Sequence, residues 1–130
     1  MLYYMYKYKK YILNKEQSII FEISELVVLF LIVIHYLYID KKILALFFTI
    51  PFVEHVRQIT IHYRQEGGSF IDYITVFYFL FGLCYSVSVS NKLGAIACII
   101  GIVIHVITIT TKTSFSQLVS YDEIKKYLFT

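Results

Sequence analysis

The sequence predicts an all-α integral membrane protein, an antiparallel bundle of four transmembrane helices. The chain has 130 residues, 58% of them hydrophobic, and a mean hydropathy of +0.68. Only 16% of the residues are charged, whereas a soluble domain of ordinary composition carries about 25%. The apolar residues also gather in four runs, each close to the roughly 20 residues that a membrane-spanning helix needs. A single membrane domain covering residues 1–130 follows.

The first two expected spans cover residues 18–39 and 43–62. Asn14, followed by Gln17 three residues later, has the spacing of a helix-capping box just before the first span. Asp40, Lys41 and Lys42 supply a short polar turn. Pro51 lies inside the second span, where we expect it to kink the helix or loosen its hydrogen bonding.

The third and fourth spans are expected at residues 71–89 and 93–111. Residues 104–111 alternate in a way that also suits a β-strand, but the neighbouring runs lack the regular turns of a membrane barrel. A helix is therefore favoured there. In that helix small residues recur on one face, which suits close helix packing; they are Gly94, Cys98 and Gly101.

The remaining segments are expected to be a cytoplasmic N-terminal arm, residues 1–17, and a cytoplasmic C-terminal tail, residues 112–130. No internal repeat or low-complexity segment is evident. Short loops rich in Lys and Arg stay on the cytoplasmic side of a membrane. Both termini therefore fall in the cytoplasm or its equivalent, in a cell or organellar inner membrane. The basic residues on that side are Lys7, Lys9, Lys10, Lys15, Arg64, Lys112, Lys125 and Lys126, against Lys41, Lys42 and Lys92 on the other.

With this orientation, polar residues of all four spans fall in the cytoplasmic leaflet. Glu54 and Arg57 are three residues apart, so they can pair along one helix. Asp72 and Thr75 open the third span at the same level. The Glu54–Arg57 pair could equally lock two helices together. Acidic residues such as Glu22 and Glu25 are also common near a helix start for electrostatic reasons. The expected intramembrane polar cluster comprises Glu22, Glu25, Glu54, His55, Arg57, Gln58 and His105.

Three functions fit this pattern. The first is a non-catalytic membrane protein that acts as an oligomer or as an accessory subunit of a membrane complex. The second is a proton- or ion-coupled channel or carrier in which Glu54 is the working group. The third is a haem or quinone anchor, which would need His55 and His105 as a ligand pair at one depth.

Other classes find no support in the sequence. No motif of a hydrolase, a metalloprotease or a nucleotide-binding enzyme is present, so no enzymatic activity is expected. Cys84 and Cys98 lack the spacing of a metal site, and we expect no metal and no cofactor. The net charge of +3 gives no footprint for nucleic acid. The expected partners are the lipid bilayer and either further copies of the chain or another membrane protein.

Overall fold

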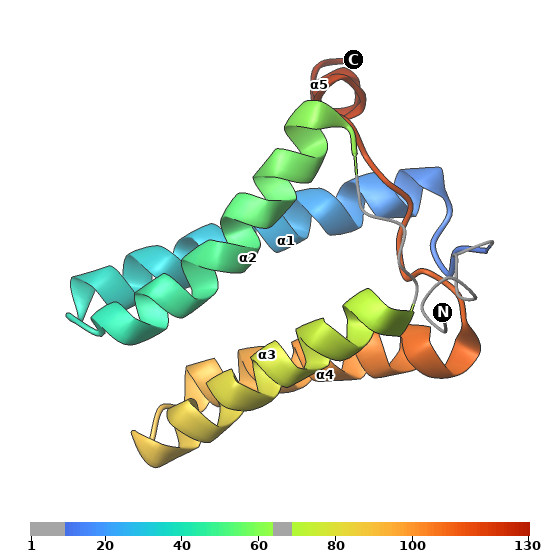
Figure 1. The fold of residues 1–130 in the computed structure, drawn as a ribbon. Helices are drawn as coiled ribbons and strands as arrows, with labels where there is room; N and C mark the ends of the chain where they lie inside the picture. Colours follow the sequence, from blue (N-terminus) through green and yellow to red (C-terminus); the bar gives the residue numbers. More distant parts are fainter. Residues whose placement is uncertain (1–9, 64–68) are drawn as a thin grey trace. The chain divides into compact units, whose positions relative to one another are not determined.

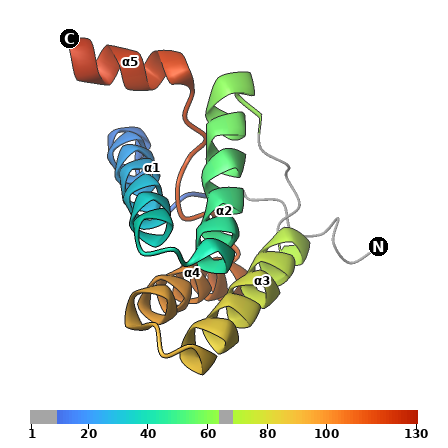
Figure 2. The same cartoon turned by 90° about the vertical axis from the view of Figure 1, so that its left-hand side faces the viewer.

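The computed structural model describes residues 10–63 and 69–130. It is all-α, and four of its helices are long and apolar enough to cross a membrane. They pack antiparallel, α1 beside α2 and α3 beside α4 (Figures 1 and 2). The predicted fold class is therefore confirmed. The helices are α1 (Lys15–Tyr38), α2 (Lys42–Ile61), α3 (Ser69–Ser88), α4 (Lys92–Thr111) and α5 (Tyr121–Phe129).

The chain divides into two compact units. One contains α1, α2 and the C-terminal residues 116–130, and the other contains α3, α4 and residues 10–12. A single membrane domain over the whole chain stays a prediction. The predictions made for residues 1–9 of the N-terminal arm and for Arg64 lie outside the described residues.

Local signals read from the sequence appear where they were expected. The Asn14 side chain accepts a hydrogen bond from the Gln17 backbone N–H, and the Gln17 side chain accepts one from the Asn14 N–H. The predicted capping box is therefore confirmed. α2 continues through Pro51. α4 is helical across residues 104–111, which excludes the strand alternative.

The two helical hairpins repeat one pattern at an offset of fifty residues. The segment HVRQIT at residues 55–60 of α2 returns as HVITIT at residues 105–110 of α4. Left-handed backbone conformations recur at the same offset in the turns, at Asp40 and Ser90, and after the second helices, at His62 and Lys112. Such conformations are uncommon for residues other than glycine. Four of them in register therefore mark the two hairpins as versions of one unit, a repeat that the sequence analysis missed.

The two hairpins differ in how their helices pack. In α1–α2 the rings of Tyr36 and Phe48 stack with centroids 5.9 Å apart, and both side chains are fully buried. Fifty residues on, Ser86 and Cys98 occupy the corresponding buried positions. Small side chains let neighbouring helix backbones approach closely. The α3–α4 hairpin thus packs through small residues where α1–α2 packs through large ones.

The small-residue face of α4 is directed into this hairpin. Gly94 and Cys98 are buried. A Cβ atom added at Gly101 would lie 2.9 Å from the ring of Phe79 on α3, closer than ordinary carbon contacts allow. The absence of a side chain at Gly101 therefore accommodates Phe79.

Each unit also contains a segment from the distant end of the chain. In the α3–α4 unit the backbone N–H of Ile12 donates to the carbonyl of Ser114 at 2.9 Å, and the backbone N–H of Ser114 donates to the backbone carbonyl of Lys10 at 3.0 Å. In the α1–α2 unit the Gln117 N–H donates to the Ser18 hydroxyl at 2.9 Å. Residues 10–12 and 116–130 are thus integral parts of the two units.

The C-terminal tail contains the helix α5, which the sequence analysis did not predict. Ser120 caps it, accepting a hydrogen bond from the Glu123 N–H at 3.2 Å. The Lys15 ammonium at the start of α1 lies 2.8 Å from the Glu123 carboxylate and donates to the Leu118 carbonyl at 2.7 Å. These contacts attach α5 to the first turn of α1.

Candidate functional site: acid–imidazole groups in both hairpins

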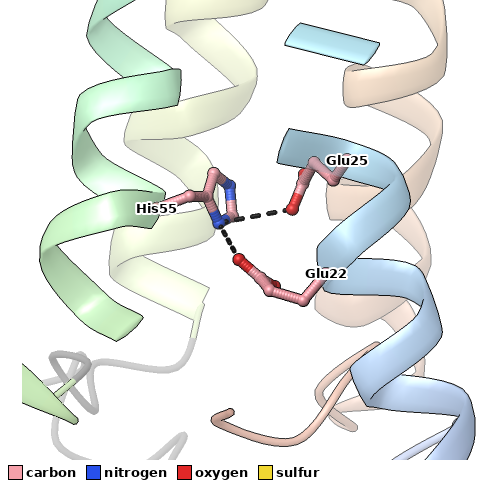
Figure 3. A group of neighbouring side chains, drawn as sticks. All are labelled: Glu22, Glu25 and His55. Atoms are coloured by element: carbon pink, nitrogen blue, oxygen red, sulfur yellow. Dashed lines mark hydrogen bonds and ion pairs between the residues drawn. The ribbon is translucent and has the colours of Figure 1, made fainter. Parts of the chain in front are cut away.

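The α1–α2 hairpin brings two glutamates of α1 against a histidine of α2. His55 Nδ1 lies 2.8 Å from Oε1 of Glu22 and 3.3 Å from Oε1 of Glu25. Figure 3 shows both carboxylates directed at the same ring nitrogen. Glu22 and Glu25 share a face of α1 because they are three residues apart. We call Glu22, Glu25 and His55 the α1–α2 site.

The α3–α4 hairpin contains a simpler version of this arrangement. His105 Nδ1 lies 2.9 Å from Oδ1 of Asp72, and the Phe79 ring stacks on the imidazole at a centroid distance of 6.4 Å. Asp72 and His105 lie fifty residues after Glu22 and His55, and each acid is 33 residues before its histidine. We call Asp72 and His105 the α3–α4 pair.

Glu22 and Asp72 are each more buried than the histidine that they contact. The side chain of Glu22 is 8% exposed and that of Asp72 is 6% exposed, while each histidine keeps a partly exposed edge. His55 lies six residues before the end of α2, about 9 Å along the helix axis at 1.5 Å per residue. An ionisable side chain at such depth in a membrane is expensive without a partner. In each hairpin the imidazole supplies that partner.

The third position distinguishes the two arrangements. Fifty residues after Glu25 stands Thr75, whose hydroxyl donates to the backbone carbonyl of Ile71 at 2.9 Å. The Thr75 hydroxyl is thus bonded within its own helix, and Thr75 has no carboxylate to match that of Glu25. The α1–α2 site has three potential metal ligands, and the α3–α4 pair has two.

Among the described residues 10–63 and 69–130, only the α1–α2 site brings together three side chains that could hold a metal ion. One ligand atom from each of its residues lies within 4.8 Å of the other two. Two carboxylate oxygens and an imidazole nitrogen are a usual donor set for divalent first-row metals. This group was not expected to be a metal site from the sequence.

Glu54 and Arg57 form a separate ion pair within α2. Arg57 Nε and Nη2 donate to the two Glu54 oxygens at 3.0 and 2.5 Å, and the Gln58 amide donates to Glu54 at 3.3 Å. At 100° per residue, Glu54 and Arg57 project about 100° and 160° away from the direction of His55. Their side chains are 47% and 40% exposed. The α2 residues of the predicted cluster thus lie on different faces of that helix, with His55 in the α1–α2 site and Glu54, Arg57 and Gln58 in a separate group.

His105 pairs with Asp72, a residue noted at the start of the third span but left out of the predicted cluster. The fifty-residue repeat was the signal that could have identified Asp72 by its equivalence to Glu22. A polar layer shared by all four helices stays a prediction, as does a haem held between His55 and His105.

Comparisons with protein-family models, curated proteins and solved structures find no match for this chain. The geometry of the two hairpins is therefore the basis for a functional interpretation.

Proposed function

We propose that this multi-pass membrane protein is a carrier or channel subunit for a cation, and that the α1–α2 site and the α3–α4 pair are its cation-binding groups. The observation that supports the proposal is the repetition of a buried carboxylate against an imidazole at equivalent positions of both hairpins. Ionisable residues inside membrane helices commonly line ion pathways.

A purely structural role explains this repetition less well. Burying a carboxylate removes its charge from water, and a contact with an imidazole offsets that penalty only in part. Close packing of small side chains can join membrane helices without any buried charge. Two such pairs in one small chain are therefore better explained by a ligand that needs their charge.

Glu54, the working group expected from the sequence, is not the cation-binding residue that we propose. Both Glu54 oxygens already accept hydrogen bonds, from Arg57 and Gln58. Glu22 and Asp72 instead face histidines across their hairpins. We assign cation binding to these two acids.

Orientation and assembly complete the proposal. With both termini in the cytoplasm, as the lysine distribution favours, the acid–imidazole groups lie in the cytoplasmic leaflet. Four short helices leave little room for a pathway within one chain, so transport would need self-association.

A second candidate function, that of an accessory subunit, is favoured by the Glu54–Arg57 pair. This pair belongs to a membrane-spanning helix yet projects away from the α1-facing side of α2, with both side chains partly exposed. Polar groups on such a face stabilise contacts between membrane helices. Glu54→Gln should then weaken binding of a partner protein, measured by quantitative co-purification, and leave flux through the protein unchanged.

Cation flux into proteoliposomes tests the main proposal. The full chain is reconstituted beside Glu22→Gln, Asp72→Asn and the control Glu16→Gln, an exposed residue in the first turn of α1. We expect the control to match the wild type and the two other variants to lose at least tenfold in rate, since each loses a binding charge. Flux that is no higher than in empty vesicles would refute the proposal. Loss of flux in Glu54→Gln alone would return the role to Glu54.

A further inference from the structure

We infer that Glu22, Glu25 and His55 bind one divalent transition-metal ion of the Zn²⁺ class. The inference rests on the proposed function for its place in transport, and it names the cation that the α1–α2 site would take. Binding itself can be measured without any flux.

The ligand atoms are already close to the positions that a metal requires. Zn²⁺ binds imidazole nitrogen and carboxylate oxygen at about 2.0–2.2 Å, so tetrahedral ligand atoms lie about 3.4 Å apart. His55 Nδ1 is 2.8 Å from Glu22 and 3.3 Å from Glu25, with all three atoms within 4.8 Å of one another. Small side-chain rotations would admit the ion between them.

The charges of the site also suit a divalent ion. Two carboxylates with a neutral imidazole carry a formal charge of −2, which one divalent cation neutralises. Charge neutrality matters here because uncompensated charge in an apolar surrounding is costly. The nine-tenths buried Glu22 is the carboxylate for which this compensation counts most.

The donor types select among divalent ions. Mg²⁺ and Ca²⁺ prefer six or more oxygen ligands, whereas an imidazole among carboxylates favours Zn²⁺, Co²⁺ and their neighbours. Three protein ligands leave a fourth tetrahedral position for water or an entering group. An open position of this kind allows the exchange that a carrier requires.

The second hairpin provides an internal control. The α3–α4 pair has the same acid and histidine but carries Thr75, hydrogen-bonded to Ile71, at the position of Glu25. Two ligands hold a transition metal less firmly than three. We therefore assign the tightly bound metal to α1–α2 and only a weak, transient cation contact to α3–α4.

The test is titration of the full chain with Co²⁺, a spectroscopic substitute for Zn²⁺, after purification in detergent without a histidine tag. We expect one Co²⁺ per chain with the visible absorption of a tetrahedral site, displaced by Zn²⁺ and unaffected by excess Mg²⁺. Glu25→Thr, which copies the second hairpin, should weaken binding at least tenfold, since even outer-sphere changes weaken metal sites by about 10- to 100-fold. Glu16→Gln, at an exposed position in the first turn of α1 outside the site, should leave it unchanged.

A volume-conserving variant guards against misfolding as an explanation. Glu25→Gln keeps the volume of the side chain, and circular dichroism should show wild-type helix content while Co²⁺ affinity falls. Wild-type binding equal to that of Glu22→Gln/Glu25→Gln/His55→Gln would overturn the inference, as would equal displacement by Mg²⁺. Metal binding without flux would uphold the inference and refute the carrier function. Flux of another cation without metal binding would do the reverse.

Discussion

The α1–α2 and α3–α4 hairpins share one acid–histidine arrangement but differ in how their interiors are packed. Both set a buried acid against a histidine 33 residues later. The first adds Glu25 and fills its interior with Tyr36 and Phe48, whereas the second has Thr75, Ser86 and Cys98 at these positions. The acid–histidine geometry is therefore compatible with both large and small interior residues. What the hairpins share is the polar group, and what varies is the packing around it.

The comparison is tested most strongly by giving the second hairpin the missing ligand. Thr75→Glu places a carboxylate at the position that corresponds to Glu25. We expect Co²⁺ stoichiometry to rise from one to two per chain in the titration described above. Thr75→Gln, which lacks the charge, is the matched control and should remain at one. A stoichiometry of one in Thr75→Glu would show that the hairpins differ in more than the third ligand.

The packing difference should appear in the unfolding free energy. Phe48→Ala removes a fully buried ring that stacks on Tyr36, and a cavity of this kind costs about 3–5 kcal/mol. Cys98→Ala, at the equivalent position, removes one sulfur atom and should cost far less. Unfolding in mixed detergent–SDS micelles measures both. Equal losses would contradict the assignment of large-residue packing to α1–α2 alone.

The two acids should differ in their importance for stability. Asp72→Ala removes the carboxylate that contacts the partly exposed His105, and the loss of a partner for such a group costs about 1 kcal/mol, the low end of the range for buried groups. Glu22→Ala should cost less, because Glu25 also lies within 3.3 Å of His55. The same micelle assay compares them. A larger loss for Glu22→Ala would mean that Glu25 does not substitute for it.

The smallest expected effect concerns α5. Burial raises the pKa of Glu123, but its hydrogen bond to Lys15, the charge of Lys15 and the bonds from Ser120 outweigh this, so the pKa falls below its ordinary value of 4.5. A lowered carboxyl pKa stabilises the folded state above the ordinary pKa, and this stabilisation disappears as the pH falls through the lowered value.

We therefore expect attachment of α5 to weaken only below about pH 4.5, as the ordinary carboxyl value sets the upper edge of the transition. The effect should stay under about 1 kcal/mol because both side chains are partly exposed. Hydrogen exchange in α5 measures it, and Glu123→Gln should remove the pH dependence. The same acid-induced change in Glu123→Gln would place its cause outside this ion pair.

Local features of the fold could be predicted because they depend on neighbouring residues. The four apolar runs, the Asn14 cap and the possible Glu54–Arg57 pair all follow from spacings of a few residues or from run length. α5 could have been found in the same way, since Ser120 and Glu123 have the capping-box spacing. Its nine residues were too short to stand out beside the long spans.

The candidate site depended on information that is not local. Glu22 meets His55 only if the turn at Asp40 sets the register of α1 against α2, and a left-handed residue in a turn without glycine gives no clear sequence signal. Comparison of the chain with itself would have helped. The recurrence of HVRQIT as HVITIT aligns His55 with His105 and, at the same offset, Glu22 with Asp72.

The placement of the end segments has a consequence for biosynthesis. Ribosomes make α1 and α2 first, but Gln117, Leu118 and Glu123, which contact Ser18 and Lys15, are translated only after all four long helices. The first hairpin can enter the membrane early and still acquire its last contacts only after the second hairpin has been translated. Synthesis of the second hairpin therefore precedes completion of the first.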